Sequence, residues 1–308
     1  MDPLIVLFGF GVGILVGVTG VGGGSLMTPI LIIVFGFKPV TAVGTDLAYG
    51  AVTKTVGGWR HLRQHTVNTR VSTWMAFGSV PSAIFGVYVL HLLRKATGGS
   101  FDKVTLAVVA GALLFTGSAV LARALFLPKL IERERDDFVL ERRHKVSAVV
   151  LGVFVGFILG MTSAGSGSLI AVGLIMLFRL APQRVVGTDV FHAAILLWAA
   201  AISHIVAGNV DYGLAGTILV GSIPGVWLGS RWAVQLPVAT LRTGLGIVLI
   251  GGGLGLLTKA GADIPAPVLA AAPLALLALF VGQSARRRTR VARSAAAGAQ
   301  ALAQPVVE

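Results

Sequence analysis

Three ionisable residues stand inside long apolar stretches of the chain, namely Asp46, Lys54 and Asp189. A charged side chain inside a bilayer is costly unless it is paired or hydrated, so such residues usually have a specific role. Asp46 and Asp189 follow the same Gly-Thr pair and lie 143 positions apart. Two kinds of role fit them equally: each carboxylate could carry a proton, or it could have a structural role, either as the charge partner of Lys54 or by accepting hydrogen bonds from backbone N–H groups that a glycine-rich break leaves free.

Two histidines share the same spacing, since His61 and His204 are also 143 positions apart. Histidine gains and loses a proton near neutral pH, which makes both of them candidate proton relays. A hydrogen bond to a neighbouring loop is the alternative role. The predicted set for proton coupling or charge pairing is therefore Asp46, Lys54, Asp189, His61 and His204.

A stretch rich in glycine and hydroxyl residues occurs twice, as GVTGVGGGSL at 17–26 and GMTSAGSGSL at 160–169. Such a density of glycine breaks a helix and frees backbone N–H groups, which are tolerated at membrane depth only beside a cavity. The positive end of the short helix that follows is a site for anions, with Ser25 and Ser168 at the expected N-cap positions. Tight packing without a ligand is the alternative. The predicted substrate-binding residues are Gly22, Gly23, Gly24, Ser25, Thr45, Gly165, Ser166, Gly167, Ser168 and Thr188.

The composition explains which elements must position these residues. The chain has 308 residues, of which 55% are hydrophobic and 12% are charged. A soluble domain has about 25% charged residues, so this chain has too few polar groups to cover a surface in water. Its apolar runs are continuous and approach the roughly 20 residues that a helix needs to cross a bilayer. We therefore predict an all-α, polytopic integral membrane protein.

The repeated spacing extends over most of the chain and predicts two copies of one unit. Each copy has about five apolar segments, some of them short or re-entrant. They are 4–19, 24–37, 40–57, 71–93 and 104–127 in the first copy, and 146–162, 167–179, 183–202, 213–234 and 238–258 in the second. Because five is odd, the second copy should have the opposite orientation in the membrane.

The basic residues give an orientation, because lysine and arginine concentrate in cytoplasmic loops. The N-terminus is expected outside and the C-terminus in the cytoplasm of the cell (inner) membrane. The predicted organisation is repeat 1 at 1–127, a charged cytoplasmic connector at 128–145, repeat 2 at 146–258, an extra C-terminal transmembrane helix at 259–285 and a basic, disordered tail at 286–308. The arginines of the tail fit anionic lipid headgroups, and no nucleic-acid partner is expected.

These motifs resemble the TauE/SafE family of sulfite exporters and related carriers of sulfur oxyanions (TSUP). The resemblance lies in Gly20 to Leu26, in Pro29, in the Pro-x4-Gly-Thr pattern at 39–45 and in the turn that follows His61. It covers roughly 5–93 and 148–235. The resemblance implies secondary transport of small anions such as sulfite, thiosulfate or organosulfonates.

The leading hypothesis is a proton-coupled secondary transporter for small sulfur-containing anions that works by alternating access around a site at the membrane midplane. The alternative is a carrier or channel for a cation or carboxylate that uses Asp46 and Asp189 as direct ligands. An enzyme is not expected, because the chain has no His-Glu-x-x-His motif and no nucleophile elbow. It has no cysteine, and no cofactor or metal is predicted.

Overall fold

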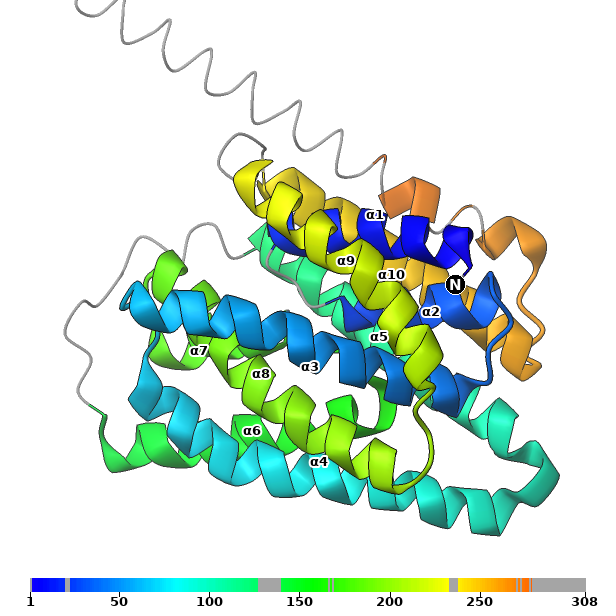
Figure 1. The fold of residues 1–308 in the computed structure, drawn as a ribbon, viewed down its shortest axis with the longest axis horizontal. Helices are drawn as coiled ribbons and strands as arrows, with labels where there is room; N and C mark the ends of the chain where they lie inside the picture. Colours follow the sequence, from blue (N-terminus) through cyan, green and yellow to red (C-terminus); the bar gives the residue numbers. More distant parts are fainter. Residues whose placement is uncertain are drawn as a thin grey trace, which may run out of the picture. The chain divides into compact units, whose positions relative to one another are not determined.

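The computed structural model describes residues 2–19, 23–126, 140–165, 167, 169–232, 238–269, 271, 273–276 and 278. In these residues the regular structure is helical, as predicted (Figure 1). The helices of the first copy are α1 (Pro3–Thr19), α2 (Gly24–Ile33), α3 (Pro39–Arg63), α4 (Thr69–Thr97), the 3₁₀ helix η1 (Gly98–Ser100) and α5 (Phe101–Phe126). Those of the second copy are α6 (Arg142–Thr162), α7 (Leu169–Phe178), α8 (Pro182–Val206), α9 (Tyr212–Trp232) and α10 (Val238–Ala260).

Within the described residues, five stretches are long and apolar enough to cross a membrane, and the first of them contains both α4 and α5. They are Thr69–Ala122, Arg142–Thr162, Gln183–Val206, Tyr212–Trp232 and Thr243–Ala260. α2 and α7 have only ten residues each, about 15 Å at helical rise. Each of these two helices is therefore half the depth of the roughly 30 Å hydrocarbon core.

Local sequence explains where several helices begin and end. Proline occupies the first turn of both α3 and α8, where its missing N–H is not needed. Asn68 caps α4 by accepting a hydrogen bond from the backbone N–H of Val71. Ser163 ends α6 in the left-handed region, with φ of 58°, and this conformation is uncommon for a residue with a side chain.

The chain divides into two units, Met1–Ile264 and Pro265–Glu308. The described part of the second unit includes a short apolar helix, Ala266–Leu276. Most of the predicted C-terminal segment beyond it, the tail at 286–308 and nearly all of the connector at 128–145 lie outside the described residues.

In the first unit, each half contributes its fourth helix to the first helix of the other half. α1 packs on α9, and α6 packs on α4 (Figure 1). Glycines allow these helices to approach closely, since a Cβ on Gly13 would lie 2.5 Å from the carbonyl oxygen of Ser222, and one on Gly156 would lie 2.3 Å from that of Ser79. Gly13 and Gly156 hold equivalent positions in the two copies, as do Ser79 and Ser222, so one contact is built twice.

Two further helix pairs join equivalent helices, α3 with α8 and α5 with α10. In α3 and α8, Gly50 approaches Leu197 while Gly58 approaches Phe191. Positions later in α3 thus meet positions earlier in α8, so these two helices are antiparallel. The α5–α10 pair is antiparallel as well, because Gly117 meets Ile250 and Leu114 meets Gly253.

Candidate functional site

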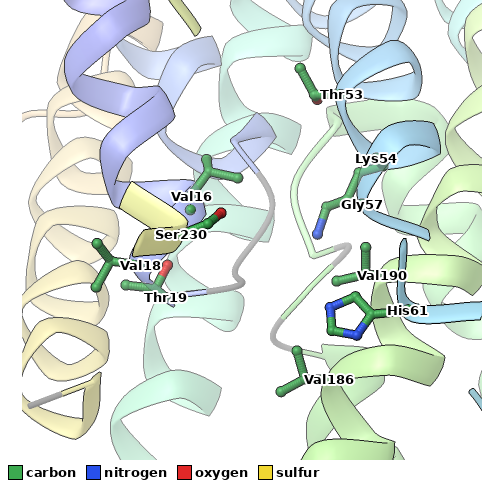
Figure 2. Close-up of a pocket in the computed structure, with 11 residues that line it drawn as sticks. Val16, Val18, Thr19, Thr53, Lys54, Gly57, His61, Val186, Val190 and Ser230 are labelled. Atoms are coloured by element: carbon green, nitrogen blue, oxygen red, sulfur yellow. The ribbon is translucent and has the colours of Figure 1, made fainter. Parts of the chain in front are cut away.

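A cavity of about 290 Å³ opens between two walls of helices (Figure 2). One wall is formed by the ends of α1 and α9, and the other by α3 and α8. The lining residues are Val16, Gly17, Val18, Thr19, Thr53, Lys54, Gly57, His61, Val186, Val190 and Ser230. The two basic residues, Lys54 and His61, both come from α3 and extend into the cavity from the same wall (Figure 2).

Lys54 is the cation of this cavity, and it is only 5% exposed. Asp189 of α8 is close enough for its charge to act on Lys54, and Asp189 is itself 3% exposed. Asp189 is thus the aspartate that lies near Lys54, and the role of the two residues as a charge pair stays a prediction. Because Lys54 also borders the cavity, a solute with negative charge would compete with Asp189 for the ammonium group.

His61 lies about two helical turns beyond Lys54 in α3 and is half-buried. Its Nδ1 is 3.0 Å from the hydroxyl oxygen of Thr66, which also donates to the carbonyl oxygen of His61 at 3.1 Å. The loop contact predicted as one alternative is thus present. The proton-relay role of His61 stays a prediction.

Asp46 does not line the cavity. It lies in a buried cluster where the start of α2 meets the end of α6, that is, where the helical structure of each half is interrupted. Its Oδ2 accepts hydrogen bonds from the hydroxyls of Thr28 and Ser163, each at 2.6 Å. The hydroxyl of Ser163 also approaches the carbonyl oxygen of Gly24 at 3.3 Å. Thr28 and Gly24 belong to α2, whereas Ser163 ends α6. The break of the first half therefore contacts the break of the second half inside the protein.

In the described part of the chain, Oδ1 of Asp46 and the hydroxyl of Tyr49 form no hydrogen bond of good geometry, although the two groups are close enough to interact with each other. Tyr49 follows Asp46 by three positions, on the same face of α3. Among the described residues, no cationic side chain is within salt-bridge distance of Asp46. The two aspartates consequently differ, since Asp189 has a lysine nearby and Asp46 has hydroxyl donors.

The predicted N-cap at Ser25 is wrong by two residues. α2 begins at Gly24 with Gly23 as its N-cap residue, and none of the described side chains caps it. Ser25 is the second residue of the helix and is 3% exposed. The glycines allow this start, because a Cβ on Gly24 would lie 2.6 Å from the carbonyl oxygen of Ser163. A backbone contact, rather than a capping hydroxyl, therefore occupies this end of the helix.

Thr45 and Thr188 lie in the contact between the halves. The hydroxyl of Thr45 accepts a hydrogen bond from the backbone N–H of Asp211 at 3.0 Å, and that of Thr188 accepts one from Asn68 at 2.8 Å. Asn68 and Asp211 begin the fourth helix of each half. The two bonds are equivalent in the two copies, and in each of them the hydroxyl oxygen is the acceptor.

The remaining predicted residues have varied positions. His204 is fully buried, and its Nε2 is 2.9 Å from the carbonyl oxygen of Gly160. Gly165 has φ of 106° in the turn after α6, and Gly167 donates to its carbonyl oxygen at 3.1 Å. Gly22, Ser166 and Ser168 lie outside the described residues. The described part of the chain holds no group of three or more acidic or histidine side chains that could bind a metal ion.

Sequence reasoning missed Thr28, Tyr49 and Ser163 as members of the Asp46 cluster. Ser163 lies within the repeated stretch, but its equivalent in the first copy is Gly20, so no repeated hydroxyl marked it. Thr28 corresponds to Ala171 and Tyr49 to His192. A search for features shared by the two copies necessarily passes over residues that only one copy has.

Comparison with known proteins identifies close relatives. The sulfite exporter TauE/SafE family matches residues 5–256. The probable membrane transporter protein YjnA of Bacillus subtilis (strain 168) is 38% identical over 257 residues, which cover 83% of this chain and 100% of that protein. YdhB, a probable membrane transporter protein of the same organism, is 27% identical over 79% of this chain and 94% of its own length. No solved structure matches the chain.

Proposed function

Since the chain belongs to the sulfite exporter TauE/SafE family, and is a multi-pass membrane transporter rather than an enzyme, we propose that it carries small sulfur-containing anions. The proposed substrates are sulfite, thiosulfate or organosulfonates. The observation that carries this proposal is the cavity with Lys54 at its wall and His61 beside it. Its volume of about 290 Å³ is at the lower end of ligand pockets, which measure roughly 300–1,000 Å³, and suits a small solute.

The charge pair in the wall of the cavity supports a link to protons. An anion that binds Lys54 takes the place of Asp189, and the carboxylate of Asp189 is then left without its cation in a buried position. A proton can replace the cation as partner of this carboxylate, so anion and proton would move together. Asp46 is the second proposed proton site, because its carboxyl group is buried and its hydrogen-bond partners are neutral hydroxyls.

The proposed transport cycle uses two inverted repeats and alternating access. The antiparallel packing of α3 with α8 and of α5 with α10 supports an inverted relation, as does the duplication of the contacts of Thr45 and Thr188. In transporters of this kind, broken helices meet near the midplane at the interface of the repeats. The contact of Gly24 with Ser163 supports a substrate site at the same location in this protein. In the proposed orientation, the N-terminus is outside the cell and the C-terminus is in the cytoplasm.

Flux into proteoliposomes tests this proposal. We expect uptake of sulfite, thiosulfate or a simple alkylsulfonate, but not of chloride alone, and we expect stimulation of the uptake by a pH gradient. Lys54→Leu introduces the residue that the second copy has at this position. This variant should reduce uptake to the level of protein-free liposomes, whereas Lys54→Arg keeps the charge and should retain part of it. Movement of a metal ion in the absence of any anion flux would refute the proposal.

A further inference from the structure

The open cavity has an equivalent region at the other end of the α3–α8 pair, and that region is closed. Each residue that lines the cavity has a counterpart 143 positions away, and every one of these counterparts is buried. Thr53, Gly57 and His61 are half-buried at the cavity. Their counterparts Leu196, Ala200 and His204 are 0% exposed. The two halves are alike in sequence, but equivalent residues are therefore exposed to a cavity at one end of the α3–α8 pair and buried at the other end.

A hydrogen bond of the closed end has no equivalent at the open end among the described residues. At the closed end, His204 of α8 contacts the carbonyl oxygen of Gly160 near the end of α6, with 2.9 Å between Nε2 and the oxygen. The equivalent residues at the open end are His61 of α3 and Gly17 of α1. Both of them line the cavity, so they stand in its opposite walls. Within the described residues, the imidazole of His61 makes its hydrogen bond through Nδ1 and makes none through Nε2.

We infer that His61 and His204 are alternating latches for the two ends of the transport path. His204 holds its end closed through the carbonyl oxygen of Gly160. When the cavity closes, His61 forms the equivalent bond with the carbonyl oxygen of Gly17, and the His204 bond breaks as the other end opens. The inference rests on the alternating access of the proposed function, and it specifies which residues hold each state.

The surroundings of each imidazole suit such an exchange. At the closed end, Nδ1 of His204 is 3.3 Å from the amide nitrogen of Asn209, which can donate to it while Nε2–H donates to Gly160. Thr66 is the equivalent of Asn209 beside His61, and its hydroxyl is within reach of both Nδ1 and the His61 carbonyl oxygen. Rotation of this hydroxyl between the two acceptors allows the proton of His61 to be on Nδ1 in the open state and on Nε2 in the latched state.

Two single-cysteine reporters measure the position of this equilibrium, since the natural chain contains no cysteine. Thr53→Cys reports on the open cavity, and Leu196→Cys reports on its closed counterpart. Each reporter is combined with His61→Ala or with His204→Ala, and its rate of reaction with a maleimide is measured in lipid nanodiscs. Both faces of the membrane are accessible there, and no transported solute is needed.

The two histidine variants should have opposite effects. His204→Ala should raise labelling at position 196 and lower it at position 53, whereas His61→Ala should lower it at 196 and raise it at 53. A net hydrogen bond of ordinary strength corresponds to a change on the order of fivefold. His192→Ala is the control, because His192 is also buried in α8 but contacts Ser72 and Ser79 of α4. It should not exchange labelling between the reporters.

Changes in the same direction, or unchanged labelling in both histidine variants, would overturn the latch. His61 is half-buried, so its variant tests the inference even if His204→Ala fails to elute as a single species in gel filtration. Failure of the latch leaves anion flux into proteoliposomes as a separate question. Conversely, an opposite shift of the two reporters supports the latch even if the transported solute is not a sulfur compound.

Discussion

The two aspartates of the repeated Gly-Thr-Asp sequence have different surroundings although their neighbours in the chain are the same. Asp189 interacts with Lys54, and Asp46 accepts hydrogen bonds from two hydroxyls. Asparagine keeps the shape of both side chains and the acceptor that Thr28 and Ser163 need, but it cannot carry a proton. This substitution therefore separates a role in proton coupling from a role in direct binding of the solute.

We expect the double variant Asp46→Asn/Asp189→Asn to bind and exchange the anion but to lose its response to protons. Exchange of labelled for unlabelled sulfite across proteoliposomes should continue, while stimulation by a pH gradient should fall to the level of protein-free liposomes. The single variants then assign the proton to one residue or the other. Loss of solute binding in the double variant would instead favour a carrier of cations or carboxylates with the aspartates as ligands.

At this scale the sequence identified Asp46, Lys54 and Asp189 as a set, because few ionisable residues occur within its apolar segments, but it did not say which aspartate lies near Lys54. It did not predict that Asp46 would bond to Ser163, which is 117 positions away. That contact depends on how the start of α2 packs against the end of α6, and the periodicity of the sequence does not indicate this packing. The same limit explains the position of Ser25, since the N-cap role was displaced by the contact of Gly24 with the backbone of Ser163.

At the scale of helices, glycines spaced by four residues in the sequence predict a close approach of backbones along one helix face. They are Gly9, Gly13 and Gly17 in the first copy and Gly152, Gly156 and Gly160 in the second. The structure confirms the approach and adds the partner, which is the fourth helix of the other half. Spacing identifies a contact face but carries no information on the neighbour. The apolar segment predicted at 40–57 is shorter than the helix α3, which ends at Arg63. The last turns of α3 contain Arg60 and Arg63, so they are helical without being apolar.

Two glycines of α1 make a matched pair for testing this packing. A Cβ on Gly13 would lie 2.5 Å from the carbonyl oxygen of Ser222, whereas a Cβ on Gly11 would meet nothing within 4 Å. Gly13→Ala should destabilise the protein by about 1–3 kcal/mol, because α1 and α9 must separate. Gly11→Ala should be neutral or stabilising by up to about 1 kcal/mol, as alanine is the better helix former.

Thermal or SDS-induced unfolding in detergent, followed by tryptophan fluorescence, measures both variants against the natural chain. The comparison is internal to one helix, so differences in detergent binding cancel to a first approximation. Equal stability of the two alanine variants would contradict the close contact of α1 with α9. The same test applies to Gly156 in the second copy, where a Cβ would lie 2.3 Å from the carbonyl oxygen of Ser79.

At the scale of the whole molecule, the orientation of the two copies determines whether alternating access is possible. An odd number of segments in each copy predicts that the second copy is upside down, and the asymmetry of lysine and arginine favours the same orientation. The loops after α3 and after α8 are equivalent in the two copies and differ in their basic residues. The loop after α3 is flanked by Arg60, Arg63 and Arg70, whereas the equivalent loop after α8 has no basic residue between His204 and Tyr212.

Cysteine labelling at equivalent positions of these two loops decides the orientation. Gln64 follows α3 and Ala207 follows α8, and both are exposed. They occupy the same position in the two copies, and the chain has no other cysteine to react. In intact cells, a maleimide that cannot cross the membrane should label Ala207→Cys and not Gln64→Cys. After the cells are broken open, both positions should react.

Labelling of both positions from the outside, or of neither, would mean that the two copies have the same orientation. His61 and His204 would then face the same side of the membrane, and they could not act as alternating latches.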